Sequence, residues 1–400
     1  MRSKNFDRIP QLESHIDPLL PRDVRASKSD ELLDLVSEYA ALVSDQAGSE
    51  GPLFPAAADQ TRGLALAQRP VFICGVPRSG TTLMQGLLNG HESLCSLPSE
   101  GSFLTSLRPR LRAMEAREAL AWLTREWVAR LININSGPHW VLGRSSRGSH
   151  PYAIFARTLL GWESLMKQNA ATGGSCHLHT AVVLAFWSVH DEHKGATQWV
   201  DKTPTNEFHA AELAQNYPKA RFIHMMRDPR AVVASRLRLQ RTLGLGDRNL
   251  RQLLVEIRRS LTLALRNRST LGHACYLWVH YERLVASPEP VMRQVAEFLQ
   301  LDYTTAMCHP VAHGDVAVAN TSFEGDRTGE DAVYQSSENL FESYLSAKEL
   351  QLISASLADV AHRCQYSLEP APLYRRLEFF STKVAVAAVR TVKRLATKSW

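Results

Sequence analysis

The sequence predicts an α/β fold, with a parallel sheet flanked by helices and helical additions at both ends of the chain. Apolar runs typical of buried strands occupy residues 71–74 and 222–226. Each run is followed by a turn and then by a segment that reads as a helix. The turn after the first run contains Gly75, Pro77 and Gly80. This strand, turn and helix should form an anion site, because backbone N–H groups and the helix dipole point at one spot.

The first turn reads G-V-P-R-S-G-T-T over residues 75–82. Its spacing is close to the nucleotide P-loop, G-x4-G-K-[ST], so we expect a P-loop-NTPase-like sheet. The difference lies at Thr81, where a P-loop kinase or ATPase carries a lysine on the β- and γ-phosphates. Arg78 is the strongest cation of the turn instead, and it can hold a doubly charged group together with Ser79, Thr81, Thr82 and backbone amides. An ordinary glycine turn of an α/β protein is the structural alternative.

A second string of residues, 221–236, repeats the order of strand, turn and helix. Asp228 and Pro229 are suited to the N-cap and first position of the helix. Arg227 then lies at the carboxyl end of the strand, and Ser235 lies about two turns into the helix. Ligands of an open parallel sheet bind at the carboxyl ends of its strands. Both strings should therefore face the same crevice.

Together, P-R-S-G-T-T and R-D-P-R-x3-S resemble the two signatures of sulfotransferases that use 3′-phosphoadenosine-5′-phosphosulfate (PAPS). The similarity extends over roughly residues 71–301, with gaps, and is closest to the branch that includes tyrosylprotein and bacterial sulfotransferases. The resemblance implies that residues 78–82 hold the 5′-phosphosulfate of PAPS. It also implies that Arg227 and Ser235 hold the 3′-phosphate.

The same resemblance implies two further catalytic residues besides Arg78. In the family a carboxylate follows the first turn by about twenty residues, and Glu100 occupies that place as the base that takes the acceptor proton. Lys202 matches the lysine of the family's K-x-P turn, which contacts the transferring sulfuryl group and the leaving oxygen. Left to the sequence alone, Glu100 could instead cap a helix and Lys202 could be a surface lysine. His91 is a rival base.

The resemblance thus implies transfer of a sulfuryl group from PAPS to a hydroxyl (or amine) of a glycan, lipid, peptide or small-molecule acceptor. No metal is required, because arginine and lysine supply the positive charge. His177, His179, His190 and His193 are spaced too loosely for a zinc site. Two alternatives stay open, a P-loop kinase or NTPase and a non-catalytic nucleotide-binding module of the same fold.

Three further inferences from the resemblance concern residues outside the two signatures. Residues 104–196 are expected to help shape the acceptor pocket, as inserts do in the family. Tyr281 begins a Y-E-x-L-V string near the nucleotide of relatives, with a core tyrosine as the alternative. Residues 320–327 fall where relatives close a basic loop, and no binding residue is assigned there. The six cysteines form no CxxC pair, which favours buried thiols over a disulfide framework.

The charge is concentrated at the C-terminus. The net charge is +6, and residues 373–400 hold seven basic residues against one acid. The other residues balance with 39 of each sign, so the chain is not expected to bind nucleic acid. We expect a basic amphipathic helix over 369–400, suited to peripheral contact with an anionic membrane. Packing on the domain or on a second subunit is equally compatible with this pattern.

The remaining predictions concern domain limits and location. Residues 1–68 should form an N-terminal helical segment, with a helix from Asp30 to Val43 packed on the main domain, and a linker over 47–69. The sulfotransferase-like domain should span 69–368. No signal peptide or bilayer-spanning apolar run is evident in the sequence, which predicts a cytoplasmic protein. The sequence leaves the oligomeric state open.

Overall fold

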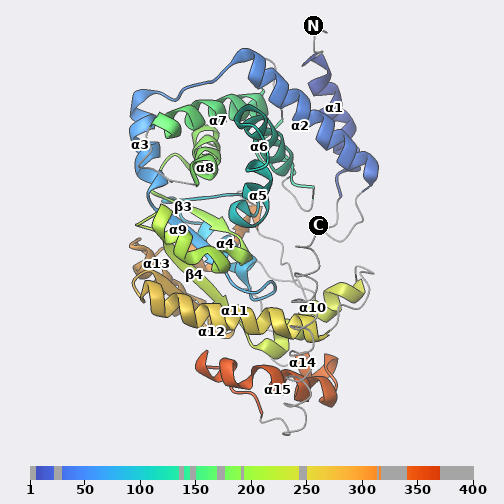
Figure 1. The fold of residues 1–400 in the computed structure, drawn as a ribbon, viewed down its shortest axis with the longest axis vertical. Coiled ribbons are helices and arrows are strands. Elements are labelled where there is room, and N and C mark those ends of the chain that lie inside the picture. Colours follow the sequence, from blue (N-terminus) through green and yellow to red (C-terminus); the bar gives the residue numbers. More distant parts are fainter. Residues whose placement is uncertain are drawn as a thin grey trace, which may run out of the picture.

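A five-stranded parallel sheet lies across the middle of the protein, between helices on both sides (Figure 1). This computed structural model describes residues 6–21, 29–134, 139–144, 150–168, 176–190, 193–242, 250–312, 315–316 and 340–369. The strand order is β2-β3-β1-β4-β5, and every neighbouring pair is parallel. The strands are β1 (Pro70–Cys74), β2 (Leu94–Ser96), β3 (Gln198–Lys202), β4 (Arg221–Met226) and β5 (Tyr276–His280). The predicted α/β fold with a parallel sheet is confirmed.

Strand β1 is the middle strand of the sheet, and the side chains on both of its faces are apolar, as its buried position requires. All five of its residues are buried. Phe72 and Cys74 enter the larger hydrophobic core, whereas Val71 and Ile73 enter a second core on the opposite face. Alternate side chains of a strand point to opposite faces, so the apolar run at 70–74 requires helices on both sides of the sheet.

Each face of the sheet has its own set of helices. The side of Val71 is covered by α4 (Thr81–Asn89), α12 (Tyr281–Ala286), α13 (Pro288–Leu299) and the 3-10 helix η7 (Thr305–Cys308). The side of Phe72 packs against α3 (Ala57–Ala67), α8 (His177–Val189) and α9 (Ala210–Asn216). A third core joins α10 (Pro229–Thr242), α11 (Leu250–Leu271), α14 (Leu340–Tyr344) and α15 (Ala347–Arg363). In Figure 1, α11 and α15 lie below the sheet.

The N-terminal helices belong to the same core as the middle of the chain. Helix α2 (Asp30–Glu50) packs on α6 (Ala116–Arg130) and α7 (Pro151–Gln168), and α1 (Ile9–Ile16) packs on α2. These helices form the upper part of Figure 1. Ser29 caps α2 by accepting a hydrogen bond from the amide of Leu32 at 3.1 Å. The prediction that the N-terminal helix packs on the main domain is confirmed, although the helix is seven residues longer than expected.

The stretch interpreted as a linker, residues 47–69, is largely helical. It holds the end of α2 and all of α3, because its alanines favour helix. Contact with the core fixes the helix in place. A Cβ on Gly63 would lie 2.5 Å from the ring of Trp162 in α7, so only glycine lets these helices approach so closely.

Short elements complete the described chain. They are η1 (Phe6–Arg8), η2 (Asp17–Leu19), a π-helical turn η3 (Phe103–Leu107), α5 (Arg108–Leu111), η6 (Pro204–His209), β6 (Val311–Ala312) and β7 (Asp315–Val316). Among the described helices, none is long and apolar enough to cross a bilayer. Residues 370–400 of the C-terminal helix predicted over 369–400 lie outside the described residues, as does the segment 320–327.

Candidate functional site

All five strands end at the same edge of the sheet, and each is followed there by a residue that the sequence analysis singled out. Glu100 follows β2 and Lys202 ends β3, while Arg78, Arg227 and Tyr281 follow β1, β4 and β5. Strands β1 and β4 are hydrogen-bonded neighbours. The two strings therefore face one crevice, as predicted from the rule for parallel sheets.

The first turn depends on two glycines. Gly75 and Gly80 have φ angles of 129° and 99°, in the range that glycine tolerates and other residues avoid. A Cβ on Gly75 would lie 2.5 Å from the carbonyl oxygen of Met225, and one on Gly80 would lie 2.6 Å from the ring of Tyr281. The turn is thus pressed against β4 and against the residue that follows β5.

Direct contacts join the two strings. Arg78 donates from Nε to Ser235 Oγ at 3.1 Å, and Arg227 donates from Nη1 to the carbonyl oxygen of Arg78 at 2.9 Å. The Arg227 guanidinium also lies 4.2 Å from the centre of the Tyr281 ring, within cation–π range. Arg78 itself has a φ of 80°, a strained value for a residue with a side chain. Arg78, Arg227 and Ser235 therefore form one cluster, called here the arginine cradle.

The arginine cradle carries concentrated positive charge. Burial lowers the pKa of Arg78 to about 10, and the nearby charges of Arg227 and then Arg236 act in the same direction, against the opposing effect of Tyr281. A bound anion would relieve this repulsion and favour the charged guanidinium. The cluster is therefore electrostatically suited to a phosphate or sulfate group.

Two donors in the cradle region lack partners. Ser79 Oγ is completely buried, and Arg227 Nε is buried as well, and neither has a hydrogen-bond partner among the described residues. Buried polar groups are normally satisfied. Thr81 and Thr82 begin α4, where backbone N–H groups are exposed at the helix start. These donors fit the acidic end of PAPS, which offers the acceptor oxygens that they lack.

Glu100 and Lys202 meet at the carboxyl end of β3, the strand that pairs with β1. Lys202 Nζ lies 2.9 Å from Glu100 Oε1, and the lysine side chain is 12% exposed against 46% for the glutamate. Neither structural alternative, a surface lysine or a helix-capping glutamate, agrees with these contacts. Lys202 is not a surface lysine, and the helical turn after Glu100 has Ser102 at its N-cap, with no side-chain cap. A carboxylate and an ammonium group thus stand together at the sheet edge, the carboxylate open to an acceptor.

His91 does not take part in this arrangement. It is buried, its Nδ1 accepts from the amide of Ser93 at 3.1 Å, and its Nε2 lies 2.9 Å from the carbonyl oxygen of Asp302. Both ring nitrogens are engaged with backbone groups. The rival base named from the sequence is therefore a structural histidine.

The histidines near α8 also have structural surroundings. His179 is buried and its ring stacks on Phe103 with centroids 5.2 Å apart. His190 and His193 stack on each other at 4.7 Å. Within the described ranges, no group of three or more His, Cys, Asp or Glu side chains could hold a metal ion. Four cysteines are buried, as expected for core thiols (Cys74, Cys95, Cys176 and Cys364).

The sequence analysis did not single out several residues that support the site. Arg130 donates from Nη1 to the carbonyl oxygen of Glu100 at 2.6 Å. Glu282 accepts from the amide of Asp228 at 2.8 Å and from the hydroxyl of Tyr366 at 2.9 Å, which ties the start of α10 to the end of the described chain. Asp201 lies directly behind the Glu100 loop. In the sequence, only its position next to Lys202 could have indicated that Asp201 supports the site.

Comparison with known proteins agrees with this geometry. The model of the Sulfotransferase family matches residues 70–305, more than half of the chain. This chain belongs to the sulfotransferase family. The matched range includes every site residue named above except Tyr366, and it begins with β1 and extends past the end of α13.

Curated relatives are protein-tyrosine sulfotransferases. Protein-tyrosine sulfotransferase A of Caenorhabditis elegans is 23% identical over 260 residues, which is 64% of this chain and 57% of that protein. The protein-tyrosine sulfotransferase of Drosophila melanogaster is 24% identical over 241 residues, which is 60% of this chain and 39% of that protein. The matches to these sulfotransferases thus span about half or less of their length.

Solved structures with similarity to this sulfotransferase-family chain include two bacterial examples. Sulfotransferase STF9 from Mycobacterium avium matches 92% of this chain and 98% of its own, with 18% identity and a TM-score of 0.39. The sulfotransferase domain of the Synechococcus PCC 7002 olefin synthase matches 75% of this chain and 96% of its own, with 19% identity and a TM-score of 0.38.

Proposed function

We propose that this chain is an enzyme that moves a sulfuryl group from PAPS to a hydroxyl (or amine) of an acceptor. The observation that carries the proposal is the Glu100–Lys202 pair, 2.9 Å apart at the end of β3, the strand that pairs with β1. Family membership supports sulfuryl transfer, and PAPS is the donor that the family implies. An anion site alone can bind the donor but cannot catalyse transfer. The pair would add a general base, Glu100, and a cation next to it, Lys202.

The donor would be held at its two acidic ends. Arg78 to Thr82 would bind the 5′-phosphosulfate through the guanidinium, Ser79 Oγ and the amides at the start of α4. Arg227 and Ser235 would bind the 3′-phosphate, with Arg227 offering its unsatisfied Nε–H. Charge-assisted hydrogen bonds of this kind are the strong ones. The 3.1 Å contact between Arg78 and Ser235 supports two subsites that lie side by side.

PAPS supplies an activated sulfuryl group, and the residues of the chain supply proton transfer and charge. Glu100 would remove the proton from the acceptor oxygen as that oxygen forms its bond to sulfur. The bond from sulfur to the bridging oxygen breaks, and its electron pair stays on that oxygen. Lys202 would stabilise the new negative charge there. Much of the rate enhancement would come from alignment and charge stabilisation.

Both alternative functions are less well supported. A kinase or NTPase of the P-loop type needs a lysine where this chain has Thr81, and the family match is to sulfotransferases. A non-catalytic nucleotide-binding module has no use for a half-exposed glutamate paired with a partly buried lysine. Glu100 therefore favours catalysis.

The curated relatives guide the choice of acceptor. Their names specify protein-bound tyrosine, so a peptide with a tyrosine hydroxyl is the acceptor we propose to test first. Glycan, lipid and small-molecule hydroxyl compounds form the comparison set. A cytoplasmic location, with peripheral membrane contact through 373–400, stays a proposal that liposome binding before and after deletion of 373–400 would test.

The test uses labelled PAPS, a tyrosine peptide and the matched comparison acceptors. The parent protein should transfer label, and Glu100→Gln should lower kcat by about 10²- to 10⁴-fold, the usual contribution of a general base. Calorimetry with adenosine 3′,5′-bisphosphate should give the same affinity for both proteins. Turnover of MgATP, or Glu100→Gln working as fast as the parent, contradicts the proposal.

A further inference from the structure

A buried carboxylate lies directly behind the Glu100–Lys202 pair. Asp201 is the residue before Lys202 in β3, and it is only 1% exposed. A buried carboxylate is stable only when hydrogen bonds or charges compensate for the loss of water. The hydrogen-bond partners of Asp201 therefore indicate which segments its carboxylate holds in position.

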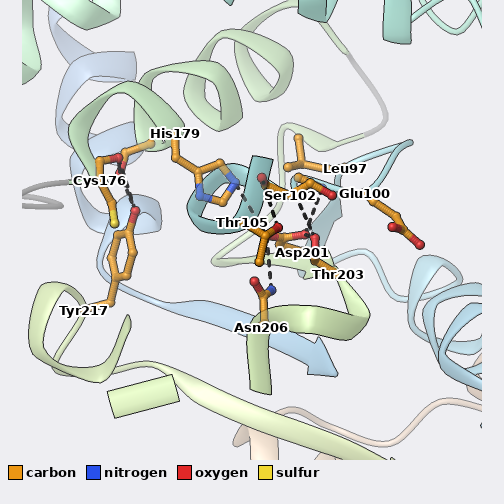
Figure 2. A network of polar contacts seen from close by, with 12 residues as sticks. Leu97, Glu100, Ser102, Thr105, Cys176, His179, Asp201, Thr203, Asn206 and Tyr217 are labelled. Carbon is orange, nitrogen blue, oxygen red and sulfur yellow. Dashed lines mark hydrogen bonds and ion pairs between the residues drawn. The ribbon is translucent and has the colours of Figure 1, made fainter. Parts of the chain in front are cut away.

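Most of those partners lie on the loop that carries Glu100 and on the turn that follows Lys202, and one more, His179 of α8, has its Nε2 3.6 Å from Asp201 Oδ2. Asp201 Oδ1 accepts from the amide of Gly101 at 3.1 Å and from Thr203 Oγ1 at 2.6 Å. Asp201 Oδ2 accepts from Asn206 Nδ2 at 3.3 Å. In Figure 2, Asp201 lies at the centre of this network, while the Glu100 carboxylate points away from it.

Thr203 extends the network by one more residue. Its Oγ1 accepts from the amide of Ser102 at 3.0 Å. The two amides that follow Glu100 are therefore held by Asp201, one directly and one through Thr203. Because Asp201 immediately precedes Lys202, the base loop and the catalytic lysine are fixed to the same strand end.

The backbone of the loop is shaped to this contact. A Cβ on Gly101 would lie 2.6 Å from Asp201 Oδ2, so glycine is required for the loop to come so close. Ser102 has a φ of 47°, which is uncommon for a residue other than glycine. Arg130 donates to the carbonyl oxygen of Glu100 at 2.6 Å. Glu100 is thus held on both sides, with only its side chain left to reach Lys202.

We propose that Asp201 is the positioning residue that sets Glu100 opposite Lys202, through its hydrogen bonds to Gly101 and Thr203. The proposal rests on the sulfotransferase function proposed above. Asp201 is 1% exposed and its carboxylate is engaged by protein groups, so it would act on the reaction only through the base loop. A misplacement of about 1 Å at a catalytic group can cost about 10²-fold in rate.

The main test is Asp201→Ala, which removes both carboxylate oxygens from the network. It should lower kcat by about 10²-fold while the affinity for adenosine 3′,5′-bisphosphate is unchanged, because the arginine cradle keeps its contacts. In a Glu100→Gln background the same change should have little further effect on kcat, since the base that Asp201 positions is already lost. An equal loss of rate in both backgrounds overturns the proposal.

A second measurement needs no turnover and separates this proposal from the proposed function. Hydrogen exchange at the amide of Gly101 should accelerate in Asp201→Ala, because this amide loses its acceptor. Exchange at the amide of Ser102 should accelerate too, because its acceptor, Thr203 Oγ1, loses the carboxylate that orients it. Unchanged protection of these amides overturns the positioning role, even if the parent transfers sulfate. If the parent transfers no sulfate, but exchange at these amides is faster in Asp201→Ala than in the parent, only the proposed function is contradicted.

Two further variants guard against a failure to fold. Gly101→Ala keeps every polar group and pushes the loop away from Asp201 Oδ2, so it should reproduce the loss of kcat. Glu163→Gln is the matched control, because Glu163 is a buried carboxylate on α7 paired with Lys167, outside the site. It should leave kcat unchanged. A parent-like kcat in Gly101→Ala counts against the proposal.

Discussion

The carbonyl oxygen of Arg78 accepts a hydrogen bond of 2.9 Å from Arg227 Nη1, although the two residues are separated by 149 positions in the sequence. The contact joins the turn after β1 to the turn after β4, which are neighbouring strands. A side chain proposed to bind one end of the donor thus also fixes the backbone that binds the other end. Loss of Arg227 should therefore affect both subsites.

The first prediction concerns Arg227→Ala. The variant should weaken binding of adenosine 3′,5′-bisphosphate by about 10- to 100-fold, since hydrogen bonds to charged groups contribute about 1.5–3 kcal/mol each. Arg227→Lys should recover only part of the loss, because lysine keeps the charge but not the planar fork. Calorimetry measures both. Arg293→Ala is the control, because Arg293 pairs with Glu289 on the solvent-facing side of α13, where both side chains are 57% exposed, and its affinity should match that of the parent.

The second prediction concerns Ser79, whose buried hydroxyl has no hydrogen-bond partner among the described residues. Ser79→Ala should raise the stability of the nucleotide-free protein by about 1 kcal/mol, because an unsatisfied buried polar group costs about 1–3 kcal/mol. The same variant should show a smaller increase in melting temperature on adding adenosine 3′,5′-bisphosphate. Thermal melts with and without the nucleotide measure both effects. A larger ligand-induced shift in the variant would contradict the proposed role of Ser79.

The third prediction separates the ring of Tyr281 from its hydroxyl. The ring packs on Gly80 and lies under the Arg227 guanidinium. Tyr281→Phe should therefore bind adenosine 3′,5′-bisphosphate as the parent does. Tyr281→Ala should bind more weakly, since cation–π contacts contribute about 0.5–2 kcal/mol and Arg227 would lose its support. Equal weakening in both variants would assign the effect to the hydroxyl instead.

Much of this site follows from local sequence, because both turns proposed to bind anions are short segments whose glycines, proline and N-cap residues act locally. The parallel sheet then brings such turns to one edge without further information. The strand order could not be predicted from local sequence, because it depends on which apolar strands pair although they are far apart in the sequence. Glu100 and Lys202 were paired only through the family resemblance, because 102 residues separate them.

Asp201 shows why the supporting residues are harder to predict. In the string D-K-T-P an aspartate beside a lysine is typical of an exposed turn, and nothing local indicates its burial. Its carboxylate is compensated by the amide of Gly101, 100 residues away. The helix α3 was missed for a related reason. Composition suggested a linker, whereas the contact of Gly63 with Trp162 holds that segment against the core.

The last prediction concerns a buried polar cluster beneath the sheet. Glu207 accepts from Ser260 Oγ at 2.7 Å, and its Oε2 lies 3.5 Å from His224 Nε2. Burial raises the pKa of Glu207 to about 8, against the hydrogen bond from Ser260 and the charge of Arg259. The folded protein therefore keeps a proton on Glu207 that the unfolded chain releases above about pH 4.5, so the contribution of Glu207 to stability falls as pH rises from 4.5 to 8.

Glu207→Gln replaces this group with a neutral side chain of the same shape. The free energy of unfolding of the variant, relative to the parent, should increase between pH 5 and pH 8 by an amount on the order of a few kcal/mol. Urea denaturation of both proteins at the two pH values measures the difference. Burial lowers the pKa of His224 to about 3, which reduces the stability of both proteins alike as pH falls below 6.5. A difference between variant and parent that stays constant from pH 5 to 8 would mean that Glu207 ionises as easily in the folded protein as in the unfolded chain.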